Sequence, residues 1–182
     1  MQIRLKKGRD GPDSLACVRD DGTSTWRRIQ RGLAFHDLAH YAVETELGVT
    51  DGFYGLVADG WSFEAFADAE ERARIPPGAI WVELLVNTFL TEAMSGALHD
   101  ADAFHASVAQ SAAQLGGSIP RRLGDEEIAG IRGTIVSLVA RWRALAPSET
   151  LELRFDAPRA TQPPSFDSIR RSGTSHSSAT NT

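Results

Sequence analysis

Strand-like alternation occurs at two places that lie far apart in the chain. Near the start, Ile3 and Leu5 alternate with polar neighbours, and residues 150–155 alternate in the same way. This period-2 pattern places every second side chain on one face, as in a β-strand with one buried face. We therefore expect the distant stretch to join the N-terminal strands in one sheet.

Two more strands are expected directly after the first. The apolar run 15–18 predicts a second strand, and residues 20–22 supply hairpin-turn chemistry before Trp26 and Ile29. An antiparallel meander of three strands should result. The single cysteine, Cys17, falls in the second strand, where a small buried side chain is a more ordinary role than a reactive thiol.

Helical spacing of apolar residues fills the segment between these strands, and it predicts about five helices. The first should end at Gly48, and the last should begin at Asp125 and stop at Pro147. The expected helices are 33–47, a shorter one that opens at Trp61 with Ser62 as its N-cap, 79–98, 101–115 and one starting at 125. Pro76 and Pro77 should close off the segment that follows the short helix.

Together these patterns predict an α+β protein. A small antiparallel sheet, made of three N-terminal strands and one C-terminal strand, should pack with about five helices. Residues 1–156 are expected to form a single domain, since a chain of 182 residues with 42% hydrophobic content can bury one sizeable core. Residues 157–182 are mostly Ser, Thr, Pro and Arg, so we expect a disordered tail.

Charge and hydropathy exclude two classes of function. The net charge is −5, whereas a nucleic-acid binder needs clustered Lys and Arg to displace counterions from phosphates. No apolar stretch approaches the ~18 residues of a membrane span, and the first residues lack an apolar signal segment. We expect a cytoplasmic protein whose partners are neither nucleic acids nor membranes.

The sequence His36-Asp37-Leu38-Ala39-His40 lies inside the first expected helix. Side chains four residues apart share one helix face, so His36 and His40 can bind the same metal ion. Glu44 lies too far along the helix to join both histidines on one ion, and we expect it to support an imidazole or act as a general base. The alternative is a pair of structural histidines that are hydrogen-bonded at the edge of the core.

A third metal ligand would have to come from another element. Glu83 lies in an apolar stretch, where a lone buried carboxylate costs free energy unless a metal ion or a histidinium offsets it. Asp51 and Glu46 are the alternatives. Glu83 is also the first of four polar residues at i, i+4 spacing, and the alternative to a ligand is a solvated polar stripe. These residues are Glu83, Asn87, Thr91 and Ser95.

Two known patterns share part of this motif. A His-Asp pair also occurs in HD phosphohydrolases, but that pattern needs an upstream histidine, and His36 is the first in the chain. The five residues from His36 to His40 resemble the HDxxH-x11-E signature of the ubiquinone-biosynthesis proteins named Coq-four, which are helical and associated with a divalent metal. Gly52 stands here at the position of that glutamate, with Asp51 one residue earlier.

A longer phrase resembles a group of uncharacterised bacterial proteins. Residues 35–44, Phe-His-Asp-Leu-Ala-His-Tyr-Ala-Val-Glu, carry an FHDLxHYxVE motif, and residues 55–61, Gly-Leu-Val-Ala-Asp-Gly-Trp, follow it. This resemblance implies no activity.

The expected function follows from the metal hypothesis. A divalent ion, expected to be zinc, would be bound by His36, His40 and Glu83 and would activate water for hydrolysis or lyase chemistry on a small-molecule substrate. Glu44 or Asp37 would move protons or orient an imidazole. The alternative is a non-catalytic module that forms a homodimer through its helix faces. The sequence leaves open whether the chain is an enzyme.

Overall fold

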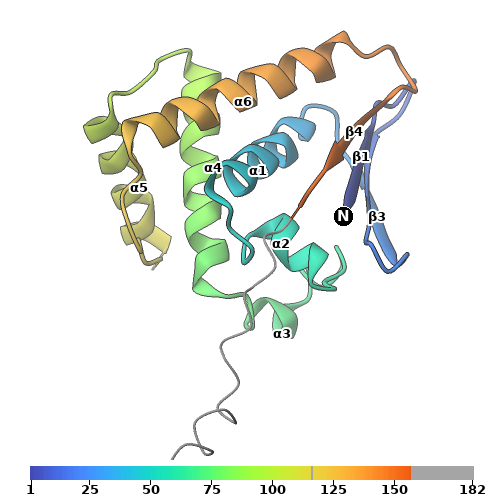
Figure 1. Ribbon diagram of the computed structural model, residues 1–182, viewed down its shortest axis with the longest axis horizontal. Helices are drawn as coiled ribbons and strands as arrows, with labels where there is room; N and C mark the ends of the chain where they lie inside the picture. Colours follow the sequence, from blue (N-terminus) through green and yellow to red (C-terminus); the bar gives the residue numbers. More distant parts are fainter. Residues whose placement is uncertain (116, 157–182) are drawn as a thin grey trace, which may run out of the picture.

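A four-stranded antiparallel sheet forms one side of the molecule (Figure 1). The computed structural model describes residues 1–115 and 117–156. The strand order is β3-β2-β1-β4, so the C-terminal strand returns to pair with β1, as the alternation predicts. The strands are β1 (Gln2–Lys6), β2 (Asp13–Val18), β3 (Ser24–Ile29) and β4 (Thr150–Arg154). The α+β class is thereby confirmed, while the predicted tail, 157–182, lies outside the described residues.

The strand register gathers the apolar side chains on one face of the sheet. Ile3 of β1 lies opposite Cys17 of β2 and Leu153 of β4. Leu5 lies opposite Leu15 in the same way. All five side chains are buried, because successive residues of a strand point to opposite faces and these residues share the inner one.

The described residues form six helices on the inner side of the sheet (Figure 1). In Figure 1, α1 lies between the sheet and α4, and α6 crosses above both. Because α1 is enclosed in this way, even its polar residues Asp37, His40 and Glu44 are buried. The helices are α1 (Ala34–Leu47), α2 (Phe53–Ala58), α3 (Ala69–Arg72), α4 (Pro77–Ser95), α5 (Ala101–Leu115) and α6 (Asp125–Ala144).

The prediction of a helix that opens at Trp61 is wrong. Ser62 accepts a hydrogen bond from the backbone N–H of Ala65 at 3.3 Å, but it caps a turn rather than a helix. The short helix α3 begins only after Asp68, whose carboxylate accepts from the backbone N–H groups of Glu70 and Glu71 at 2.9 and 3.0 Å. Ser62 and Asp68 are both residue types that favour the N-cap position, and Asp68, the later one in the chain, is the N-cap of the helix.

One further helix boundary differs from the prediction, and one helix was not predicted. Pro77 opens α4 instead of closing the preceding segment, because a residue without an N–H fits the first turn of a helix. The helix α2 was not predicted, since six residues are too few to display a helical period. Although α4 is largely apolar, none of the helices within the described residues combines the length and hydropathy that a membrane crossing requires.

Candidate metal centre

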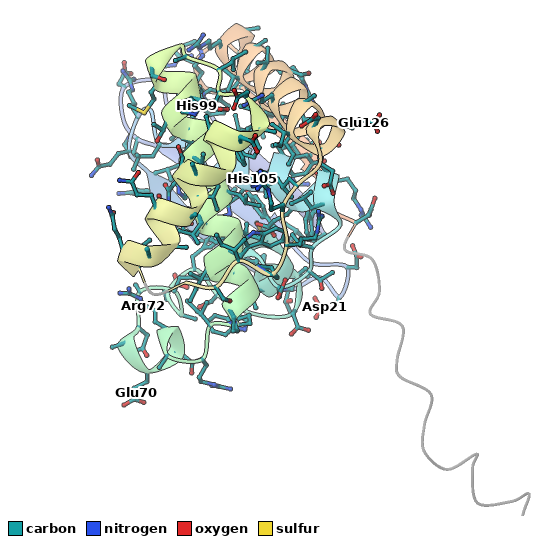
Figure 2. The ribbon with its side chains drawn as sticks, turned by 90° about the vertical axis from the view of Figure 1, so that its left-hand side faces the viewer. Asp21, Glu70, Arg72, His99, His105 and Glu126 are labelled. Carbon is teal, nitrogen blue, oxygen red and sulfur yellow. The ribbon has the colours of Figure 1, made fainter. Side chains whose placement is uncertain are left out.

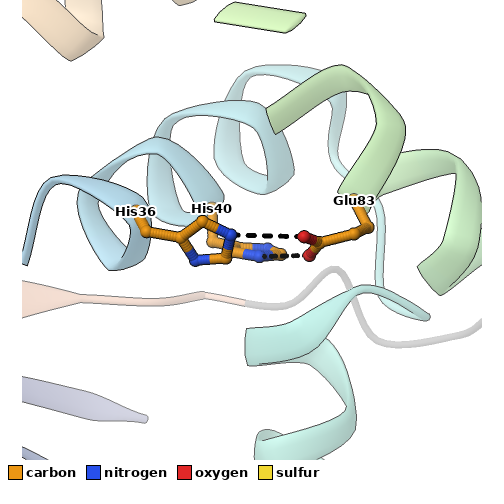
Figure 3. A group of neighbouring side chains, drawn as sticks. All are labelled: His36, His40 and Glu83. Atoms are coloured by element: carbon orange, nitrogen blue, oxygen red, sulfur yellow. Dashed lines mark hydrogen bonds and ion pairs between the residues drawn. The ribbon is translucent and has the colours of Figure 1, made fainter. Parts of the chain in front are cut away.

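Two histidines on one face of α1 point at a single carboxylate on α4 (Figure 3). The Nε2 atom of His36 lies 3.2 Å from Glu83 Oε1, and the Nε2 atom of His40 lies 3.0 Å from Glu83 Oε2. The i, i+4 spacing stacks the imidazoles edge-on, with ring centroids 4.8 Å apart. The packing of α1 against α4 thus brings together the three residues that the sequence predicts as metal ligands.

The spacing of these side chains suits one small metal ion. One donor atom from each residue lies within 4.8 Å of the other two. Ligands bound about 2.1 Å from a tetrahedral ion lie roughly 3.4 Å from each other. The nitrogen–oxygen separations of 3.0 and 3.2 Å are close to that value, so an ion could bind here with only small side-chain movements.

Glu44 contacts His40 through the other ring nitrogen. Its Oε1 atom lies 3.2 Å from His40 Nδ1, and the backbone N–H groups of Tyr54 and Gly55 donate to its carboxylate at 3.2 and 3.0 Å. A carboxylate that accepts from Nδ1 leaves the Nε2 lone pair available to a metal ion. Glu44 is therefore placed to orient His40, and it lies outside the group of three candidate ligands.

Hydrogen bonds set the protonation of the group. Burial disfavours the charged form of His40, but the bonds to Glu44 and Glu83 outweigh it and raise the pKa of His40 to about 9. Burial also opposes ionisation of Glu83, yet His36 and His40 hold the pKa of this carboxyl well below its usual range. The metal-free group therefore contains a histidinium bound to an ionised Glu83, and a divalent ion would displace the proton from His40 Nε2.

The polar stripe predicted along α4 begins at the same carboxylate. Asn87 donates from Nδ2 to Glu83 Oε1 at 2.9 Å, and Thr91 donates to the backbone carbonyl of Asn87 at 2.8 Å. The Glu83 side chain is 42% exposed, so it contacts solvent as well as the histidines. Glu83 thus belongs both to a solvated stripe and to the candidate site.

Asp37 lies beside the group without contributing to it. Its Oδ1 atom accepts a hydrogen bond of 2.7 Å from Nη2 of Arg27, a residue of β3. Burial raises the pKa of the Asp37 carboxyl, and Arg27 opposes that rise. Asp37 is therefore placed to act on the site through Arg27, whose partnership the sequence did not reveal.

A cavity of about 380 Å³ opens beside the three candidate ligands. Its volume lies within the range of about 300–1,000 Å³ that small-molecule sites occupy. His36, His40 and Glu83 line one part of it. Other parts of the wall are apolar and include Phe53, Phe66, Ile75 and Ile80. Two cationic side chains, Arg27 and Arg72, also line the cavity. A ligand in the cavity would contact the open side of an ion bound by the three residues.

The alternative third ligands lie elsewhere. The Asp51 carboxylate packs against the backbone of Gly78 at the start of α4. Glu46 turns toward α6 and accepts a 2.6 Å hydrogen bond from Thr134 Oγ1. Among the described residues, the group that can share one ion therefore has Glu83 as its carboxylate.

A second buried polar cluster escaped the sequence analysis. Glu92 of α4 is 2% exposed and binds Arg132 of α6 through two contacts of 2.6 and 2.9 Å. Figure 2 shows His105 on α5 and His99 just before that helix. The backbone N–H of His99 donates to Glu92, and the imidazole of His105 lies 3.0 Å from the carbonyl oxygen of Leu123. Both histidines thus have structural contacts.

Comparison of the chain with family models, curated proteins and solved structures found no match. The resemblances to the Coq-four signature and to the bacterial FHDLxHYxVE group stay predictions. The roles of His36, His40, Glu83 and Glu44 rest on the geometry of the site.

Proposed function

We propose that the chain is a metal-dependent hydrolase that binds zinc through His36, His40 and Glu83. One observation carries the proposal: two imidazole nitrogens and a carboxylate converge from two packed helices at the wall of a cavity. Three protein ligands leave one coordination position open, which is the arrangement of catalytic rather than structural zinc sites. Lyase chemistry, in which the zinc-bound water would add to a double bond of the substrate, would use the same three ligands.

The bound ion would supply a Lewis acid and a water whose pKa falls to about 7. Residues of the chain would orient the ligands and form the walls of the cavity. Glu44, held by two backbone N–H groups, would keep His40 in the tautomer that presents Nε2 to the site. Phe53 and the other apolar walls would contact the apolar part of a substrate beside the ion.

Metal analysis of untagged protein tests the binding part of the proposal. The wild type should retain close to one zinc per chain, and the double variant His36→Ala with His40→Ala should retain almost none. His99→Ala with His105→Ala is the matched control, because it removes two histidines that lie outside the site. Equal metal content in the first variant and the wild type would refute the site, and recovered iron would redirect the proposal to non-haem iron chemistry.

Activity is tested on the same samples. Hydrolysis of a panel of aryl esters and anilides should be lost on chelation, return with added zinc and be absent in the histidine double variant. Activity that survives complete zinc removal would show that hydrolysis does not depend on the metal. Full zinc occupancy without turnover of any substrate would refute the hydrolase and leave a non-catalytic protein.

A further inference from the structure

One guanidinium in the cavity wall is held unusually firmly. The Arg27 guanidinium lies over Phe53 and Phe63, with its carbon 5.2 and 5.1 Å from the two ring centroids. Cation–π contacts of this kind fix the plane of the group as well as its position. Arg27 therefore presents a preoriented cation to the cavity that it lines with His36 and His40.

Hydrogen bonding leaves part of this guanidinium available to a ligand. Nη2 donates to the buried carboxylate of Asp37 at 2.7 Å. Within the described residues, Nε is buried without a hydrogen-bond partner and cannot be reached from the cavity. Nη1 makes no hydrogen bond to a protein group there, and the Arg27 side chain is 36% exposed, so Nη1 is the group that a ligand could contact. Asp37 is 1% exposed, so it anchors one edge of Arg27 from inside the protein.

The cationic group also lies close to the candidate metal ligands. The ring of Phe53 contacts both residues, with its centroid 5.2 Å from the His40 ring and 5.2 Å from the Arg27 guanidinium carbon. A ligand that spans one aromatic ring could therefore reach both Arg27 and an ion bound at His40. Other residues that line the cavity are apolar, among them Phe66 and Ile75.

We propose that the cavity binds a small apolar carboxylate, with the carboxylate on Arg27 and the apolar part against Phe53, Phe66 and Ile75. The idea rests on the proposed function in one respect, namely that the bond to be hydrolysed would face the metal. With Nη2 of Arg27 bonded to Asp37, the remaining accessible N–H donors of the guanidinium, those of Nη1, can bind a singly charged carboxylate. A phosphate monoester carries about −1.5 to −2 charges at pH 7 and would call for more donors than Arg27 alone offers.

Isothermal titration calorimetry on the zinc-loaded full chain tests the assignment with two probes of equal shape, 4-phenylbutyrate and 4-phenylbutan-1-ol. The wild type should bind the carboxylate about tenfold to a hundredfold more tightly than the alcohol, as expected for a charge-assisted hydrogen bond. Arg27→Met should erase that preference. Arg74→Met should preserve it, because Arg74 is exposed, pairs with Glu71 and does not line the cavity.

Two further samples keep the outcome decisive. Arg27→Met leaves Asp37 buried without its partner, so Arg27→Met combined with Asp37→Asn provides a second variant that removes both charges. Phenyl phosphate provides the competing anion, and tighter binding of phenyl phosphate than of 4-phenylbutyrate would overturn the carboxylate assignment. A carboxylate preference that survives in Arg27→Met and in the double variant Arg27→Met with Asp37→Asn would overturn the role of Arg27.

Zinc content of each sample separates this inference from the proposed function. Arg27 is not a metal ligand, so Arg27→Met and the double variant Arg27→Met with Asp37→Asn should retain zinc while they lose the carboxylate preference. A wild type that binds no zinc would refute the proposed function, and its carboxylate preference would still report on Arg27. A zinc-loaded wild type that binds both probes equally would refute the carboxylate site alone.

Discussion

His40 Nδ1 lies 3.2 Å from Glu44 Oε1, so two residues one turn apart on α1 connect the candidate ligands to a different helix. Glu44 accepts from the N–H groups of Tyr54 and Gly55 in α2, and it contacts His40 at the nitrogen that faces away from Glu83. The orientation of the imidazole therefore depends on the junction of α1 with α2. This dependence makes Glu44 a positioning residue whose effect on metal binding can be measured.

Glu44→Gln should weaken zinc binding by about tenfold to a hundredfold, the usual effect of losing a carboxylate behind a ligating histidine. A glutamine also turns its own NH₂ group toward one of the backbone N–H donors, which leaves a buried donor without an acceptor. Competition with a chromophoric chelator measures the affinity.

Glu46→Gln is the control for this substitution on the same helix. Glu46 bonds Thr134 on the surface, so the affinity of this variant should match that of the wild type. A loss of zinc in Glu46→Gln would instead identify Glu46 as a ligand, and unchanged affinity in Glu44→Gln would remove Glu44 from the site.

Gly52→Ala should disturb the same junction. A Cβ atom at Gly52 would lie 2.5 Å from Cδ of Glu44, and the Glu44 carboxylate is buried and hydrogen-bonded, so it cannot swing away. We expect a loss of about 1–3 kcal/mol in the free energy of unfolding, as for other overpacked sites, together with weaker zinc binding. Urea unfolding and chelator competition measure the two effects.

Gly133→Ala supplies the comparison for Gly52→Ala. A Cβ at Gly133, inside α6, would meet no atom within 4 Å, so alanine should be neutral or stabilise by up to about 1 kcal/mol. If Gly52→Ala changed the free energy of unfolding and the zinc affinity as little as Gly133→Ala, Gly52 would not pack closely on Glu44.

The parts of the site that lie on one helix could be predicted from the sequence. His36 and His40 share a face because of their spacing, and the supporting position of Glu44 follows from its distance along the helix. Glu83 was recognisable because a carboxylate in an apolar stretch needs a partner. The sequence could not decide between Glu83 and Asp51, since that choice depends on how α4 packs on α1.

Contacts between distant elements could not be predicted. Arg27 lies on a strand that alternates like any other, and only the closure of the fold brings its guanidinium to Asp37 and the cavity. Glu92 was overlooked for the same reason, because its partner Arg132 follows 40 residues later on another helix. Such pairs leave no periodic signal in the sequence.

Arg132→Met should strongly destabilise the protein. It leaves the Glu92 carboxylate, which is 2% exposed, without its two contacts to the guanidinium. Removing one partner of a buried ion pair costs about 3–5 kcal/mol, because the remaining charge is uncompensated. Thermal and urea unfolding should both report this loss.

Arg122→Met separates the effect of burial from that of losing an arginine. Arg122 pairs with Asp102, and their side chains are 64% and 93% exposed. Exposed pairs contribute little, so stability should change by no more than about 0.5 kcal/mol. Equal losses in the two variants would show that the Glu92–Arg132 pair has no special role.

Cys17 should be inert toward thiol reagents in the folded protein. Its side chain is wholly buried in β2, and burial raises the pKa of the thiol to about 12. Because only the thiolate reacts, roughly one molecule in 10⁴ would carry the reactive form at pH 8 even if the reagent could reach it. The raised pKa means that the folded state favours the neutral thiol, so this contribution to stability is complete below pH 9 and declines as the pH rises toward 12.

An assay with a chromogenic disulfide should therefore find no fast reaction in buffer at pH 8 and one thiol per chain in urea. Chelator treatment should leave the slow reaction unchanged, because Cys17 lies outside the group of candidate ligands. Rapid stoichiometric reaction of the native protein would contradict the burial of Cys17, and acceleration after zinc removal would show that the metal site stabilises the sheet.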